Sequence, residues 1–222
     1  ALTLAVAAGA CAHKSAGGGA PPQRPPGSAG FQPPAAADLP LPDSIPGVFT
    51  VRQKLVAKSP HGGGSFEAVL AKKPGRLTLV GLLPYGARAF LLEQQGSDVQ
   101  FTNYLPRDVP FPPSWVLLDV YRVFGTWLGP PLADGEREGV AKGERVRERW
   151  RAGKLIERRF LRAAKEAPPA NAPIMITYQE QEATPGVAER VQLRNDRFGY
   201  ELSIQTLPTP PASPASPALP AP

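Results

Sequence analysis

Cysteine, methionine and histidine are nearly absent from this sequence of 222 residues. The chain has one cysteine, one methionine and two histidines, His13 in a Gly/Pro-rich stretch and His61 in a glycine run. So few histidines and cysteines leave no recognisable catalytic triad or metal cluster. Nucleophile-elbow, dinucleotide and Walker patterns are absent as well. We therefore expect a binding protein that is not an enzyme, with no cofactor and no bound metal.

Long hydrophobic runs are also missing. Residues 1–10, "ALTLAVAAGA", form an apolar segment that is too short to cross a bilayer as a helix. Its composition is typical of the hydrophobic part of a secretion signal. Because the sole methionine is Met175, we expect the sequence to start inside that signal, of which residues 1–10 would be the remnant.

The single cysteine follows this segment directly. The small residues Ala8, Gly9 and Ala10 before Cys11 resemble a bacterial lipobox, although Ala8 stands where Leu is most common. The resemblance implies cleavage before Cys11 and acylation of that residue, which would hold the protein on a membrane. Alternatively, Cys11 is an ordinary residue in a signal of the secreted and released type. Acylation is the preferred reading, because a lone thiol is unusual in an oxidising compartment.

Composition divides the rest of the chain into three parts. Residues 11–46 are rich in Pro, Gly and Ala and are expected to form a disordered linker. Residues 47–207 can bury a core and are expected to form one domain, and residues 208–222 form a Pro/Ala/Ser tail. The net charge of +6 is compatible with nucleic acid, but an exported chain meets none. Anionic lipid or other envelope glycans are the more suitable partners.

Apolar and polar residues alternate with a period of two through most of the domain. In "GVFTVRQKLVAK", Phe49, Val51 and Leu55 alternate with polar residues, and the same scheme recurs in "PIMITYQEQ", "AERVQLRN" and "GYELSIQTL". A turn at Gln95-Gly96-Ser97 separates two such segments. The pattern predicts an antiparallel meander, in a protein that is mainly β.

One central segment has helical spacing instead. In "PPSWVLLDVYRVFGTWL", Leu117, Tyr121, Phe124 and Leu128 fall on one side, and Ser114 can act as the N-cap. We expect a nearly buried helix that covers the apolar face of a curved sheet. Three valines lower the helix propensity, so a strand is the alternative.

The stretch "GERVRERWRAGKLIERRF" allows two interpretations. A hairpin turning at Ala152-Gly153 places Arg145, Arg147 and Arg149 on one face. A helix would carry a glycine in its middle, at a cost of about 1 kcal/mol, so we favour the hairpin. Its arginines are either a solvated outer face or a basic strip that rests on phosphate-bearing lipid headgroups.

The order of these segments resembles a family of short bacterial envelope lipoproteins of unassigned function. The residues that carry the likeness are "RLTLVGLLPYGARAFLLEQQGSDVQF", "FPPSWVLLDVYRVF", "RAGKLIERRF", "MITYQEQ" and "GYELSI". More distantly, the chain is similar to the outer-membrane lipoprotein receptor LolB and its soluble partner LolA. This resemblance implies a half-barrel of about ten antiparallel strands, whose concave apolar face accepts acyl chains under a helical lid. It also implies an outer-membrane lipoprotein that faces the periplasm, and we expect a monomer.

Two sets of site residues follow. The candidates for lining an acyl-binding cavity are Leu79, Phe90, Leu92, Phe101, Leu117, Tyr121, Phe124, Ile176, Tyr178 and Leu202. In the receptor an exposed leucine on an early loop helps to deliver lipoproteins to the membrane, and Leu82, Leu83 and Tyr85 occupy a comparable loop here.

Both sets have a second interpretation, because an apolar lining and a packed core share one sequence signature. The leucines of the loop would then end a central strand. The expected function is the binding of a lipid or of the acyl part of a lipidated molecule. The alternative is a structural or protein-interaction lipoprotein whose core is filled.

Overall fold

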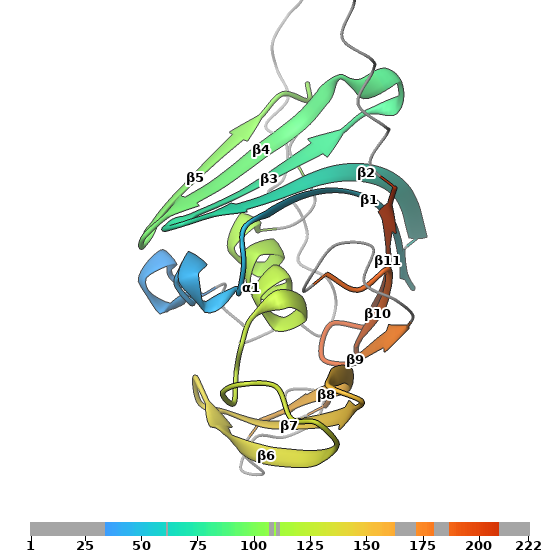
Figure 1. Cartoon of the computed structure of the whole chain (residues 1–222). Coiled ribbons are helices and arrows are strands. Elements are labelled where there is room, and N and C mark those ends of the chain that lie inside the picture. The colour runs from blue at the N-terminus through green and yellow to red at the C-terminus, as the bar shows by residue number, and fades with distance from the viewer. Residues whose placement is uncertain are drawn as a thin grey trace, which may run out of the picture.

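The chain forms one antiparallel sheet that curls around a single α-helix (Figure 1). This computed structural model describes residues 34–60, 62–106, 109, 112–162, 172–179 and 187–208. The signal remnant, Cys11, the first part of the predicted linker and nearly all of the predicted tail lie outside these residues. The predictions for those segments stay predictions.

The sheet has eleven strands, and short 3-10 helices flank it. The strands are β1 (Phe49–Ser59), β2 (Gly62–Lys73), β3 (Arg76–Leu82), β4 (Arg88–Gln95), β5 (Asp98–Asn103), β6 (Gly135–Ala141), β7 (Glu144–Arg151), β8 (Lys154–Leu161), β9 (Ile174–Gln179), β10 (Arg190–Asn195) and β11 (Tyr200–Leu207). The 3-10 helices are η1 (Ala36–Asp38), η2 (Pro42–Ser44) and η3 (Pro84–Gly86), and the α-helix is α1 (Pro113–Phe124).

The sheet consists of two meanders that meet in its middle. The strand order is β5-β4-β3-β2-β1-β11-β10-β9-β8-β7-β6, so the first strand pairs with the last. Strands β5 and β6 are the two edges, and the sheet does not close through any described residues. Helix α1 connects these edges and lies on the inner side of the curved sheet (Figure 1). The predicted fold class, a mainly β half-barrel with a helix on its concave face, is confirmed.

Alternation along the strands places the core on that concave face. In β1, the side chains of Phe49, Val51 and Leu55 are buried, whereas Thr50 and Lys54 between them are exposed. One row across the sheet pairs Val51 with Leu70, Leu70 with Leu79, Leu79 with Leu92, and Leu92 with Phe101. Such cross-strand apolar pairs are what hold an antiparallel sheet together.

The turns follow the local chemistry of the sequence. Gly96 lies between β4 and β5 with a φ of 58°, at the predicted turn. Ala152 and Gly153 connect β7 and β8, with φ angles of 48° and 76°. Two consecutive positive φ angles are typical of the tight turns that match the twist of a hairpin. The hairpin prediction for this stretch is therefore confirmed over the helical alternative.

Helix α1 starts with proline. Pro113 is its first residue, a favoured position because proline has no N–H to leave unbonded there. The prediction that Ser114 caps the helix is wrong, since the N-cap is Pro112 and Ser114 lies inside the first turn. The helical prediction itself is confirmed over the strand alternative. Leu117 and Tyr121 are both fully buried against the sheet.

The folded region begins before residue 47, the predicted start of the domain. Leu39 and Ile45, from the predicted linker, are buried in the same core as the strands. They retain only 3% and 1% of their exposure. Single apolar residues among prolines and alanines have no helical or strand period, so the sequence pattern gave no reason to place them inside.

A close contact between two strands yields a stability prediction. Phe90 packs over Gly81 on the neighbouring strand, and a Cβ at position 81 would lie 2.3 Å from the ring. We expect Gly81→Ala to lower the free energy of unfolding by about 1–3 kcal/mol, because the ring must move out of its packed position. Urea denaturation would measure the loss.

The matched control is Gly64→Ala in β2, where the added Cβ meets nothing within 4 Å. That variant should keep the wild-type midpoint or exceed it. Equal midpoints for the two variants would show that the Phe90 contact is not tight.

Candidate functional site

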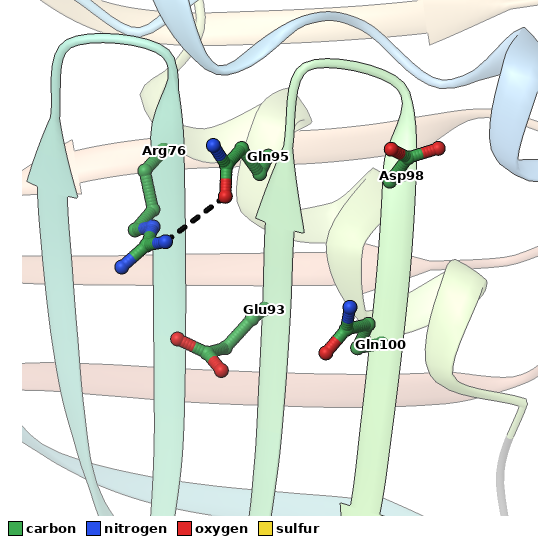
Figure 2. Close-up of a pocket in the computed structure, with 5 residues that line it drawn as sticks. All are labelled: Arg76, Glu93, Gln95, Asp98 and Gln100. Atoms are coloured by element: carbon green, nitrogen blue, oxygen red, sulfur yellow. Dashed lines mark hydrogen bonds between the residues drawn. The ribbon is translucent and has the colours of Figure 1, made fainter.

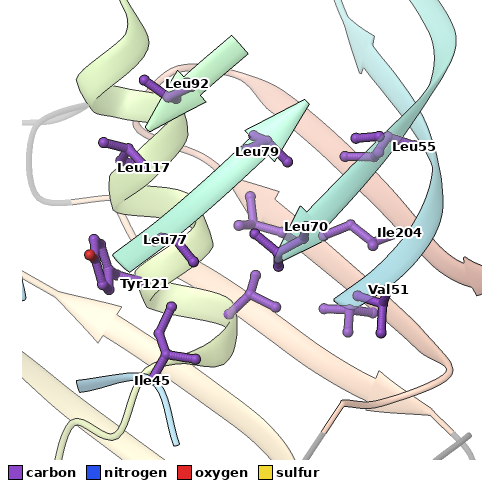
Figure 3. Close-up of a cluster of buried hydrophobic side chains, with 14 of the residues drawn as sticks. Ile45, Val51, Leu55, Leu70, Leu77, Leu79, Leu92, Leu117, Tyr121 and Ile204 are labelled. Carbon is purple, nitrogen blue, oxygen red and sulfur yellow. The ribbon is translucent and has the colours of Figure 1, made fainter. Parts of the chain in front are cut away.

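The structure brings the predicted lining residues together. Six of them are buried in one apolar cluster between α1 and the sheet: Leu79, Phe90, Leu92, Leu117, Tyr121 and Ile176. The other four are partly buried against it: Phe101, Phe124, Tyr178 and Leu202. In Figure 3, Leu117 and Tyr121 project from α1 beside Leu77, Leu79 and Leu92 of the sheet. The helix thus lies where the acyl chain of the prediction would lie.

Two hollows of the described surface lie elsewhere and are lined mostly by polar and charged residues. Arg76, Glu93, Gln95, Asp98 and Gln100 line one of about 140 Å³ on the outer face of β3, β4 and β5 (Figure 2). Across it, Arg76 donates a hydrogen bond of 2.9 Å to Gln95.

A second hollow lies where β1 ends, beside the turn between β10 and β11. Its lining residues are Lys58, Ser59, Pro60, Arg194, Asp196, Gly199, Tyr200 and Glu201. Neither hollow contains any of the predicted lining residues.

Charged side chains occupy the other half of the concave face. Glu144 of β7 accepts from Arg122 of α1, at 3.2 Å, and from Arg197 of the turn between β10 and β11. Arg122 also pairs with Asp119 at 3.2 Å, and Tyr200 donates to Asp119. We call these five residues the Glu144 cluster. It ties the helix to two strands that are distant in the sequence.

In this cluster, burial and the neighbouring arginines shift the pKa values of the carboxyl groups in opposite directions. Burial raises the pKa of the Asp119 carboxyl above its usual range, and the neighbouring Arg122 opposes this only in part. For Glu144, burial also acts to raise the pKa, but Arg122 and Arg197 together hold it below the usual value. Glu144 is therefore the carboxylate that keeps its charge between the two guanidinium groups.

A second cluster fixes the C-terminal end of α1. Arg158 of β8 donates to the Arg122 carbonyl at 2.7 Å, and the Tyr178 hydroxyl donates to the Val123 carbonyl at 2.8 Å. Glu148, which is 1% exposed, pairs with Arg158 at 2.8 Å and with Arg137 at 2.7 Å. The last carbonyls of a helix lack partners within it and attract positive charge. Tyr178, a predicted lining residue, is thus also a helix cap, and burial raises its pKa to about 12.

Sequence reasoning missed both clusters, although one signal was present. The alternation in "ERVRERWR" places Glu144 and Glu148 on the same face as Val146, which is fully buried. Two acids on the inward face of a strand indicate buried partners. The arginines that pair with them come from other elements, so their identity could not be read from the strand.

The predicted basic strip lies on the outer face of β7. Arg145, Arg147 and Arg149 keep 59%, 51% and 50% of their side-chain exposure. Glu138 pairs with the first two at 3.5 and 2.9 Å, and Glu157 pairs with the third at 3.1 Å. The strip is therefore exposed, but its charge is partly balanced.

The predicted membrane-contact loop forms an exposed corner of the sheet. Leu82 ends β3 and is half-buried, Leu83 is 39% exposed, and Tyr85 is fully exposed. Tyr85 has a φ of 75°, a conformation that costs energy for a residue with a Cβ. Tyr104 follows β5 at the same end of the sheet, bonded to the Ala89 carbonyl, and is 47% exposed. An aromatic ring held outward in this way has no packing role in the described structure.

The Glu144 cluster yields a prediction for unfolding. Replacing Glu144 with Gln leaves two buried guanidinium groups without their shared carboxylate, so we expect a loss of about 3 kcal/mol. The control Glu138→Gln removes an exposed carboxylate that also has two arginine partners. It should cost less than about 1 kcal/mol. Equal losses in chemical denaturation would contradict the burial argument.

The effect of Glu144→Gln on stability should also depend on pH. Because the folded pKa of Glu144 is depressed, its contribution is fully present above the unfolded value of about 4.3. It is lost as the pH falls through the lower folded value. The stability difference between wild type and Glu144→Gln should therefore shrink on acidification below pH about 4.3. A difference that stays constant down to pH about 2 would show that Glu144 is not paired as described.

No group of three or more His, Cys, Asp or Glu side chains in the described part of the chain could hold a metal ion. No helix among these residues is long and apolar enough to span a membrane.

The sequence matches one protein family over most of its length. The family DUF3261, described as proteins of unknown function, matches residues 50–208. This range includes every strand but the first residue of β1. The match confirms the predicted resemblance to a family of unassigned function. None of the curated proteins matches the sequence.

Two solved structures are similar to this chain at low sequence identity. A putative outer membrane lipoprotein-sorting protein domain from Vibrio parahaemolyticus is 11% identical, with a TM-score of 0.44, over 72% of this chain and 83% of that one. A DUF1329 family protein from Desulfovibrio piger is 12% identical, with a TM-score of 0.36, over 75% of this chain and 87% of that one.

Proposed function

The chain belongs to the DUF3261 family of proteins of unknown function, and we propose that it binds the acyl chain of a lipid or lipidated protein on its concave face. The observation that carries the proposal is the apolar surface of β1 to β5, on which α1 lies with Leu117 and Tyr121 buried. Burial of apolar surface is worth roughly 25 cal/mol per Å² removed from water. Binding of this kind needs no covalent step.

Such binding requires α1 to move, and its contacts differ from end to end. The C-terminal end is held by Arg158 and Tyr178 through the carbonyls of Arg122 and Val123. Toward the N-terminal end, Leu117 is buried in the apolar cluster and Trp115 packs on Phe198, with ring centroids 4.4 Å apart. An acyl chain can replace apolar contacts at little net cost, whereas it offers nothing in place of hydrogen bonds from a buried arginine and tyrosine. The apolar contacts of α1 are therefore the ones that a ligand would take over.

The exposed corner supports a membrane location for this activity. Leu83, Tyr85 and Tyr104 would enter the interface of a bilayer, where aromatic rings with one polar end are favoured. Acylation of Cys11 would hold the domain at the same membrane, and the basic strip would lie near its headgroups. We propose the outer membrane of the cell envelope, on its periplasmic side, as the site of action.

A protein-interaction role is the second candidate. The observation that favours it is the filled core, in which α1 and two ion clusters already cover the concave face. In that case the domain would be a rigid scaffold and would take up no lipid.

Lipid binding separates the two candidates. The full chain should displace a fluorescent fatty acid with saturable, micromolar affinity, and native mass spectrometry should detect phospholipid bound after gentle purification. Phe101→Glu, on the concave side of β5, should weaken binding by about tenfold or more, equal to about 1.4 kcal/mol. Thr102→Glu, its exposed neighbour on the other side of the strand, should leave binding within about twofold.

Circular dichroism would verify that both variants fold. The absence of saturable binding by the wild-type chain would exclude the acyl-binding function in favour of the scaffold. Equal losses in both variants would place any lipid outside the concave face.

Membrane contact has its own test. Replacing both Leu83 and Tyr85 with Ser should reduce the fraction of protein that sediments with anionic vesicles, because two exposed apolar side chains leave the interface. Val140→Ser is the control, since Val140 is 76% exposed on the edge strand β6. Its sedimentation should equal that of wild type. A loss of the same size in the control would indicate nonspecific adsorption of the protein.

A further inference from the structure

Residues 34–46 lie across one end of the helix and sheet. Helix η1 contacts β5 and helix η2 contacts β3, so this short segment reaches over the N-terminal half of the sheet. In Figure 1 the two 3-10 helices, in blue, lie beside α1 below the ends of these strands. Leu39 and Ile45 insert into the core, while Leu41 between them is 57% exposed. We call residues 34–46 the strap.

The strap is bonded to the loop that follows α1 and, through Gln94 of β4, to α1 itself. The backbone N–H of Thr126 donates to the Ser44 carbonyl at 2.7 Å. The buried amide of Gln94 donates to the Pro40 carbonyl at 3.0 Å and accepts from the Tyr121 hydroxyl at 2.7 Å. Figure 3 shows Ile45 beside Tyr121. One glutamine therefore joins the strap, β4 and the helix.

A carboxylate of the strap also bonds to β2 and to the turn that follows it. Asp43 accepts from the Lys72 ammonium at 3.1 Å and from the backbone N–H of Gly75 at 2.9 Å. The Lys72 side chain is 4% exposed, whereas that of Asp43 is 68% exposed. The anchoring carboxylate is thus at the surface, where water competes for it.

We propose that the strap holds α1 closed over the concave face and that its release is the step that opens the acyl site. The proposal rests on the acyl-binding function above and assigns its regulation. The strap contributes few contacts compared with the sheet, so it belongs among the segments that open locally. It also lies in the sequence between Cys11 and β1. A pull from a membrane anchor at Cys11 would reach the strap before any strand.

Release of the strap would increase the fraction of the protein that can bind an acyl chain. If the open form is a minor fraction of the protein, the apparent dissociation constant exceeds the intrinsic one by the inverse of that fraction. Loosening the strap raises the fraction and so tightens binding. A strap that only stabilises the fold would change the free energy of unfolding and leave the affinity of the folded protein unchanged.

The test uses the full chain and a fluorescent fatty acid as the probe. Ile45→Ala opens a hole beside Tyr121, and we expect about fivefold tighter binding together with faster hydrogen exchange of the α1 amides. Asp43→Asn removes the ion pair with the buried Lys72 ammonium and leaves Leu39 and Ile45 in place. It should tighten binding in the same way, and it serves as the second variant if Ile45→Ala does not fold. Leu41→Ala, on the exposed side of the strap, is the matched control and should match wild type in both measurements.

Each outcome has one meaning. Faster exchange in α1 with unchanged affinity would overturn the proposal, because the helix would be released without opening a site. Unchanged exchange in both strap variants would overturn it as well. Binding that is absent from wild type and variants alike would instead refute the acyl-binding function, and the regulation with it. Tighter binding in the strap variants but not in Leu41→Ala supports both.

Discussion

A wide sheet with one apolar face has to be covered by a short helix. Eleven strands spaced about 4.8 Å apart span about 48 Å, whereas the twelve residues of α1 extend for only about 18 Å. A flat sheet would leave most of its core residues in water. Curling the sheet around the helix reduces this mismatch, and the strap and the two ion clusters cover what the helix does not. The curvature, the buried arginines and the buried part of the N-terminal segment all follow from this constraint.

The two halves of the concave face are covered in different ways. Strands β1 to β5 present leucines and phenylalanines to α1, the kind of surface that another apolar molecule can share. Strands β7 and β8 present Glu144 and Arg158, which bond to α1, and Glu148, which pairs with Arg158. Buried ion pairs add little net stability, because their desolvation offsets their attraction, but losing one partner is costly. We infer that they position the helix, and that the apolar half is where exchange with a ligand would occur.

Sequence patterns predicted the sheet well and its covering only in part. The period of two located β1, β4 and β9 to β11, and the turns at Gly96 and Gly153 followed from residues that tolerate positive φ. The helix was found from the spacing of Leu117, Tyr121 and Phe124, although its N-cap was placed two residues late, at Ser114 instead of Pro112. These features are local, so neighbouring residues contain the information.

The strap and the ion clusters depend on contacts between distant parts of the chain. Ile45 becomes buried only because Tyr121 and Thr126 are folded beside it, and Glu144 is tolerated inside only because Arg122 and Arg197 reach it. No short stretch of the sequence contains both partners of such a contact. The candidate lining residues were identified correctly as inward-facing, but whether α1 or a ligand faces them depends on the mobility of the helix.

The most direct measurement of the central claim is hydrogen exchange of the α1 amides with and without saturating fatty acid. The account predicts that the acyl chain lowers protection in α1 while β7 and β8 keep theirs. Equal protection of α1 in both states would contradict it.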